Sequence, residues 1–259
     1  MNRQLIRQAT NIIAVIATIV INILANALPF NGLTTAEISD RFQVYFVPAG
    51  YVFSIWGLIY LGLIGFAVYQ ALPGQRENPR LQSVGYLFAL SSLANIVWLF
   101  LWHYELFPLT ILAMLSLLIL LIIIYLRLGI GRTVVSPGEK WFVRVPFSIY
   151  LGWVTVATIA NVTDLLEYLN WGGWGINPQI WAFIMLIAGA AIALMVNLSR
   201  DDSAYVLVII WAYVGIAIKQ ADTTVVAIPA WIIAVGFAVL LVIKALQNIR
   251  LKPTSAMAR

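Results

Sequence analysis

The sequence predicts an all-α integral membrane protein with about eight transmembrane helices. Hydrophobic residues make up 63% of the 259 residues and charged residues only 10%, whereas a soluble domain carries roughly 25% charged residues. Apolar runs of about 20 residues, the length that crosses the hydrocarbon core of a bilayer, recur along the whole chain. Hydrocarbon is therefore the expected solvent, and residues 1–259 are expected to form a single membrane domain.

Eight apolar runs can be placed in order, separated by helix-breaking residues such as Pro73–Gly74 and Pro137–Gly138. The first run follows Arg3 and Arg7 without a convincing small-residue cleavage site, so we interpret it as a retained span rather than a signal peptide. The predicted spans cover residues 10–28, 48–72, 81–103, 106–128, 141–168, 176–198, 203–220 and 224–246.

The basic residues indicate how these spans are oriented. If the N-terminus faces the cytoplasm, all of the 15 Lys and Arg residues except Arg41 and Lys219 fall in cytoplasmic segments, as the positive-inside rule requires. Both termini are therefore expected in the cytoplasm, with the multi-pass chain in the cell (inner) membrane. The basic residues form no patch that would follow nucleic-acid phosphates, and the absence of cysteine excludes disulfides and thiolate chemistry.

The longest outer connection covers residues 29–47. Within it, Thr34 and Glu37 have the spacing of a capping box, and Leu33, Ile38 and Phe42 would form an apolar stripe. A short interfacial helix that covers the bundle and an ordinary ordered loop are both consistent with this pattern.

Residues with catalytic chemistry are scarce. The sole histidine, His103, lies at a span end beside Trp102, where the aromatic belt of the membrane interface explains both. Asp164 and Glu167 are three apart near the outer end of the fifth span, where we expect them to be solvated; sharing a proton or a cation is the alternative. We predict no catalytic or metal-binding residues, and binding rather than enzymatic activity.

Uncharged polar and aromatic residues recur at helical spacing within the spans, which places each set on one helix face. An unpaired amide in hydrocarbon is costly, so these faces should point inward. They would either hold the bundle together by hydrogen bonds and packing, or line a pocket for a flat hydrophobic ligand. The sets are Asn22 with Asn26, Trp56 with Tyr60, Asn95 with Trp98 and Trp102, and Trp153 with Ala157 and Asn161.

Three of these segments resemble the TspO/MBR family of tryptophan-rich sensory or translocator proteins. Residues 153–161 (WVTVATIAN) are similar to the fifth helix of the family, residues 95–98 (NIVW) to the third, and residues 48–60 (PAGYVFSIWGLIY) to the start of the second. The resemblance covers residues 10–168, and residues 176–246 would be a three-helix addition. Phe53 and Trp56 are one residue closer than in the family pattern, and Pro146 lies further before Trp153.

The resemblance implies a five-helix core that binds porphyrins or other flat hydrophobic molecules, such as sterols, beneath the loop that joins the first two helices. We therefore expect a membrane receptor or carrier with a sensory or regulatory role and no covalent cofactor. A porphyrin or other tetrapyrrole is the expected ligand. The predicted ligand-binding residues are Trp56, Tyr60, Asn95, Trp98, Trp153 and Asn161.

Two other functions stay open at this point. One is an intramembrane enzyme that acts on an isoprenoid, pigment or tetrapyrrole through Asp164, Glu167 and His103. The other is a passive transporter of a hydrophobic solute. Small residues such as Gly62 and Gly65 support close helix contacts within or between chains, so a homodimer is also left open. The expected partners are thus a hydrophobic small molecule and the lipid bilayer, with no nucleic acid.

Overall fold

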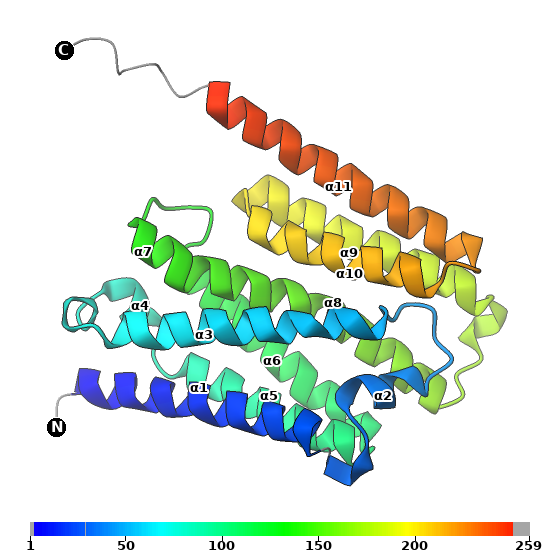
Figure 1. Cartoon of the computed structure of the whole chain (residues 1–259), viewed down its shortest axis with the longest axis horizontal. Helices are drawn as coiled ribbons and strands as arrows, with labels where there is room; N and C mark the ends of the chain where they lie inside the picture. The colour runs from blue at the N-terminus through cyan, green and yellow to red at the C-terminus, as the bar shows by residue number, and fades with distance from the viewer. Residues whose placement is uncertain (1–2, 29, 251–259) are drawn as a thin grey trace.

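The computed structural model describes residues 3–28 and 30–250, and over these residues the chain is a bundle of α-helices without strands (Figure 1). Eight helices form the body of the bundle. They are α1 (Arg3–Ala27), α3 (Ile55–Ala71), α5 (Leu87–His103), α6 (Phe107–Arg127), α8 (Val145–Tyr168), α9 (Pro178–Arg200), α10 (Ser203–Lys219) and α11 (Thr224–Arg250). Pro29, the first residue of the outer connection over 29–47, lies outside the described residues.

The helix lengths confirm an all-α membrane protein. Six helical segments in the described ranges are long and apolar enough to cross a membrane, and the other two apolar helices, α5 and α10, have 17 residues each. Three short helices lie in the connections: α2 (Thr35–Asp40), α4 (Pro79–Val84) and α7 (Pro137–Glu139).

The third span begins later than its apolar run. Residues 81–103 were predicted to form one helix, but α4 ends at Val84 and α5 begins at Leu87. Gly85 between them has φ +54° and ψ −125°, a backbone conformation that glycine adopts at little cost. The hydropathy pattern runs through this break because Leu81 and Val84 before it and Leu87 after it are all apolar.

Helices α3 and α8 cross at a glycine. A Cβ atom added to Gly62 would lie 2.9 Å from the Cβ of Pro146, so only glycine permits this approach of the two helices. Pro146 lies near the start of α8, just after a π-helical turn over Lys140–Arg144. The close crossing brings the aromatic side chains of α3 against those of α8.

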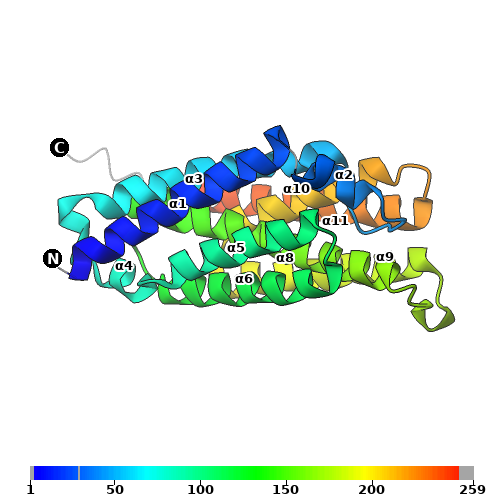
Figure 2. The same cartoon turned by 90° about the horizontal axis from the view of Figure 1, so that it is seen from below.

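The last three helices pack onto the rest of the bundle through α10, which lies between α8 and α11 (Figures 1 and 2). The Tyr205 hydroxyl of α10 donates a hydrogen bond to Thr155 Oγ1 of α8 at 2.9 Å. On another side of α10, the Tyr213 hydroxyl donates to the Leu186 carbonyl of α9 at 2.8 Å. Since both hydroxyls are paired, tyrosine can be buried here without an unsatisfied donor.

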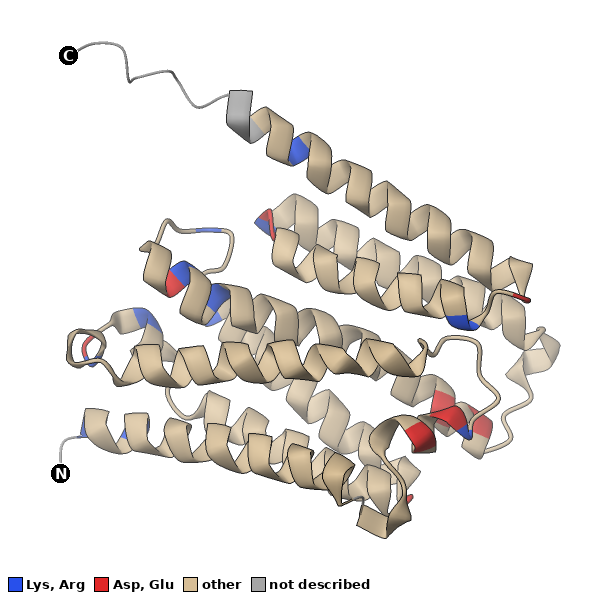
Figure 3. Ribbon diagram, viewed as in Figure 1, with Lys and Arg blue, Asp and Glu red and all other residues tan. Residues whose placement is uncertain are grey.

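The two ends of the bundle differ in charge. Figure 3 shows most Lys and Arg at the end where α1 and α8 begin, which we call the basic end. The opposite end carries Glu37, Asp40 and Glu105, and we call it the acidic end. Which end faces the cytoplasm stays a prediction, and Lys252 and Arg259 lie outside the described residues.

Candidate ligand pocket

All six predicted ligand-binding side chains line one of two adjoining cavities, which lie beneath α2 and towards the acidic end. The Trp/Asn pocket has a volume of about 40 Å³, and five of the six line it: Trp56, Asn95, Trp98, Trp153 and Asn161. The side cavity, of about 290 Å³, is lined by Trp56, Trp98 and the sixth residue, Tyr60, together with Asn22 and Asn26.

The wall between the two cavities is aromatic. Trp56 stacks on Tyr60, one helical turn away on α3, with 5.7 Å between ring centroids. On α8 it meets Tyr150 and Trp153 edge-to-face, at 6.0 and 6.3 Å. Phe53 packs against the same Trp153 ring at 5.7 Å. Trp56 lines both cavities, as do Thr35, Phe53 and Trp98, so it forms part of the wall that the cavities share.

A chain of hydrogen bonds crosses the Trp/Asn pocket. The Trp98 Nε1–H donates to Asn161 Oδ1 at 3.1 Å, and Asn161 Nδ2 donates to Thr110 Oγ1 at 2.9 Å. These bonds join α5, α8 and α6. On the other side, Asn22 Nδ2 of α1 donates to Asn95 Oδ1 at 2.9 Å. The amides therefore hold four helices together in addition to lining the cavity, which confirms that the polar faces bond across the bundle, whereas a ligand in the cavity stays a prediction.

Asp164 also lines the Trp/Asn pocket, contrary to the expectation that it is solvated. The residue is 2% exposed, and among the described residues its Oδ1 atom has no hydrogen-bond partner. Glu167 is exposed, so the two carboxylates do not share a proton or a cation. The reason is rotation along α8: Asp164 continues the inward face of Asn161, whereas Glu167 has turned away from it.

Two further unpaired polar atoms lie in the same lining. The Trp153 Nε1–H and the Asn95 Nδ2 amide are buried and find no acceptor in the described part of the chain. Buried polar groups normally have a partner, so two donors and one carboxylate oxygen around this small cavity have hydrogen-bonding capacity that the described residues do not use. A molecule in the cavity could accept a hydrogen bond from Trp153 and donate one to Asp164.

The roof of the pocket is α2, which confirms the short helix in the outer connection. Thr34 and Glu37 form both hydrogen bonds of a capping box at its start. Trp102 Nε1 donates to the Thr35 carbonyl at 3.2 Å and so fixes the roof to α5. At the edge of the roof, Arg41 pairs with Glu105.

Two residues assigned to the membrane interface are instead buried. Trp102 is 3% exposed and packs with its ring stacked on Trp98 at 5.5 Å. His103 is fully buried, with Nδ1 2.9 Å from the Leu99 carbonyl and the ring edge-to-face with Phe30. The belt interpretation is wrong for both because the connection over 30–47 folds over the end of α5 and covers them.

Sequence reasoning missed several lining residues, including Thr35, Phe53 and Met114. Phe53 lies in a 3₁₀ turn (Gly50–Ser54) ahead of α3, where helical periodicity gives no signal. Helical periodicity did give a signal for Trp102, because this residue shares a helix face with Asn95 and Trp98. In the described part of the chain, no three His, Asp or Glu side chains are close enough to hold a metal ion.

Comparison with known proteins gives a family. A family model described as TSPO-like protein matches residues 8–243. The match includes the five helices of the predicted core and also the last three helices as far as residue 243. No match was found among curated proteins or among solved structures.

Proposed function

Because the chain belongs to the TspO-like family, we propose that this membrane protein binds a flat hydrophobic ligand in the Trp/Asn pocket, as a receptor or carrier with a sensory or regulatory role. The observation that carries the proposal is the meeting of Trp56, Trp98 and Trp153, from three different helices, around one cavity with unpaired polar atoms. Aromatic faces stack on a flat ligand, and a few placed polar groups orient it.

The volumes favour a pocket that opens when the ligand binds. About 40 Å³ is far below the roughly 300–1,000 Å³ of small-molecule sites, but the side cavity of about 290 Å³ lies directly behind Trp56. Movement of the Trp56 ring off Tyr60 would join the two spaces. We therefore propose that the ligand enters through the side cavity, between α1 and α3, and stacks on the Trp56 ring after that ring has moved.

The unpaired atoms favour one class of ligand. A molecule with both hydrogen-bond acceptors and donors on a flat apolar frame would pair with Trp153 Nε1 and Asp164 Oδ1. A porphyrin or other tetrapyrrole carries donors and acceptors at separate positions on a wide ring, whereas a sterol has a single hydroxyl, which would have to serve both protein atoms from one point. The proposed ligand is therefore a tetrapyrrole, and its binding would need no covalent attachment.

Titration of the purified protein with a porphyrin, followed by tryptophan fluorescence, tests the site. We expect saturable quenching in the wild type and a Kd about tenfold higher in the triple variant Trp56→Phe, Trp98→Phe, Trp153→Phe, because stacking area and the Trp153 donor are lost. The matched control replaces three exposed tryptophans, Trp141, Trp174 and Trp231, by phenylalanine and should retain the wild-type Kd.

If porphyrin gives the same binding curve for the wild type and for the first triple variant, the assignment of the site is wrong. A sterol titration runs in parallel, and stronger binding of the sterol than of the porphyrin would remove the tetrapyrrole while keeping the pocket. The enzymatic alternative has no support from the geometry, since Asp164 lines the pocket whereas Glu167 is exposed and His103 is buried against Phe30.

A further inference from the structure

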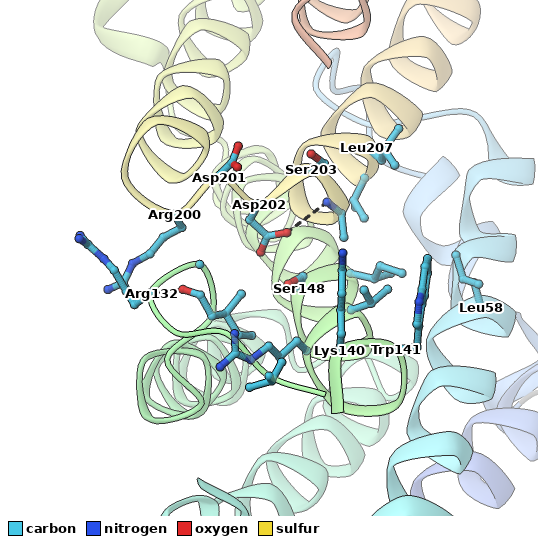
Figure 4. A pocket seen from close by; sticks show the side chains of 18 of the residues that line it. Leu58, Arg132, Lys140, Trp141, Ser148, Arg200, Asp201, Asp202, Ser203 and Leu207 are labelled. Atoms are coloured by element: carbon cyan, nitrogen blue, oxygen red, sulfur yellow. Dashed lines mark hydrogen bonds between the residues drawn. The ribbon is translucent and has the colours of Figure 1, made fainter. Parts of the chain in front are cut away.

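A larger cavity, of about 1230 Å³, lies near the basic end between α3, α8 and α10, and we call it the basic groove. Figure 4 shows Lys140 and Trp141 at the groove beside Leu58 of α3, together with Asp202, the N-cap residue of α10, and Ser203 and Leu207 of that helix. The loop over residues 130–135 forms part of its rim. None of the six predicted ligand-binding residues lines this groove.

The walls of the groove are apolar and face outward from the bundle. Leu58, Trp141 and Leu207 are 53%, 63% and 57% exposed, so each presents a large hydrophobic surface to whatever fills the groove. Trp211 closes the far end, where its Nε1 donates to the Val52 carbonyl at 3.0 Å. From Ser203 to Trp211 the α10 axis rises by about 12 Å, close to the roughly 15 Å of hydrocarbon in one leaflet.

The rim of the groove has an excess of positive charge that the protein does not neutralise. Arg132, Lys140, Arg144 and Arg200 line it, against two carboxylates. Asp201 pairs with Lys244. Asp202 accepts from the Tyr125 hydroxyl at 2.9 Å and from two backbone amides at the start of α10. Among the residues whose side chains the structure describes (3–28 and 30–247), those of Arg132 and Lys140 have no hydrogen-bond or ion-pair partner.

The rim is held in place by buried contacts. Arg144, only 7% exposed, donates to the Thr133 carbonyl and hydroxyl and, at 3.1 Å, to the Leu128 carbonyl, and its Nε is buried without an acceptor among the described residues. Gly131 has φ +73°, and a Cβ there would lie 1.8 Å from the Arg200 carbonyl oxygen. The loop that carries Arg132 is thus fixed against the end of α9.

We propose that the basic groove binds an anionic phospholipid from the leaflet at the basic end. One acyl chain lies along Leu58, Trp141 and Leu207, and the phosphate is held by Arg132 and Lys140. Length and charge together carry this assignment: the apolar part is as deep as one leaflet, and unpaired cations stand where that leaflet has its headgroups. A lipid without net charge would leave the rim unneutralised.

Native mass spectrometry of the full chain, released from micelles with equal amounts of phosphatidylglycerol and phosphatidylcholine, tests the proposal. The wild type should retain one phosphatidylglycerol in preference to phosphatidylcholine. Arg132→Gln with Lys140→Gln should lower that preference by about fivefold for each charge removed. The control is the double variant Arg3→Gln with Arg127→Gln, at two exposed basic residues outside the groove, which should behave as the wild type.

A second pair of variants tests the acyl chain. Leu207→Trp fills the groove without changing charge and should abolish phosphatidylglycerol retention. Leu112→Trp, on the exposed face of α6 with similar exposure (64%), should not. Equal retention of the two lipids by the wild type would overturn the proposal. So would displacement of the lipid by millimolar inorganic phosphate with no effect of Leu207→Trp, because the groove would then be a site for a soluble anion.

Discussion

The Trp/Asn pocket and the basic groove differ in their free volume and in how many of their polar groups are paired. In the pocket, side chains from four helices hydrogen-bond to one another, as Trp98 does to Asn161, and little free volume is left around the few atoms that stay unpaired. In the groove, the carboxylates are bonded but Arg132 and Lys140 are not, and a volume of about 1230 Å³ stands open. If both sites bind the ligands proposed for them, the protein would have to rearrange to fill the pocket, whereas the groove already has the volume for an acyl chain.

The two sites also differ in how much a substitution should change the free energy of unfolding. A polar group in hydrocarbon must be paired, so the amides of the pocket contribute to folding and cannot be changed freely. Charges at the bilayer interface are hydrated and cost little when unpaired. Substitutions in the pocket should therefore change stability and binding together, while substitutions of the groove's exposed charged side chains, Arg132 and Lys140, should change binding alone.

The largest effect on stability is expected in the rim loop of the basic groove, where the backbone at Gly131 packs against the end of α9. Gly131→Ala places a Cβ within 1.8 Å of the Arg200 carbonyl at a φ of +73°, so the rim loop must move, at a cost of about 2–4 kcal/mol. Thermal unfolding in detergent should show the loss, and porphyrin binding to the folded protein should be unchanged. Gly172→Ala is the control, because a Cβ there meets open space. Loss of porphyrin binding in Gly131→Ala would mean that the two sites are coupled.

The next effect lies in the hydrogen-bond chain of the pocket. Asn161→Ala leaves Trp98 Nε1 without an acceptor and breaks the bond to Thr110. We expect a loss of about 1–2 kcal/mol in unfolding free energy. A double-mutant cycle with Thr110→Val should give a positive coupling energy. Val162→Ala, on the exposed face of the same helix, should change stability less, and the reverse order would remove the structural role of the amide.

A smaller effect separates ligand contact from packing. Asp164→Ala removes the unpaired oxygen in the pocket, and porphyrin affinity should fall by about fivefold to tenfold. Asp164→Asn keeps an acceptor at the same position and should restore most of the affinity. Glu167→Ala, at the exposed neighbour, serves as the control. If Asp164→Asn binds as weakly as Asp164→Ala, the ligand interacts with the charge of the Asp164 carboxylate rather than with a hydrogen-bond acceptor.

The smallest effect concerns the roof. Hydrogen bonds from Thr34 to the Glu37 carboxylate lower the pKa of Glu37 below its ordinary value. A carboxyl group with a lowered folded-state pKa stabilises the fold above its unfolded pKa, about 4.3, and this stabilisation disappears as the pH falls through the folded value. Porphyrin should therefore enter somewhat faster below about pH 4 in the wild type. Glu37→Gln should remove that pH step, and an unchanged step would place its origin outside the roof.

Helix periodicity predicted most of what lies inside the bundle. Asn95 and Trp98, and Trp153 and Asn161, were predicted to face inward from their spacing, and they do line one cavity. The break at Gly85 was not predicted, since an apolar run shows no difference between one helix and two. Trp102, His103 and Asp164 were placed near water or the interface because they stand at helix ends, and depth along a helix does not reveal what covers that end.

The sequence by itself determined the membrane class, the number of membrane-spanning helices and the faces that point inward. The reason is that hydrocarbon offers no hydrogen-bond partners, so backbone and amide groups must pair within the protein. Only the tertiary structure decided that α2 covers the acidic end, that Trp56 lines two cavities, and that Arg132 and Lys140 stand at the mouth of a groove. These features arise between segments far apart in the chain, such as Val52 and Trp211. Their relative position depends on how helices pack, which no local pattern encodes.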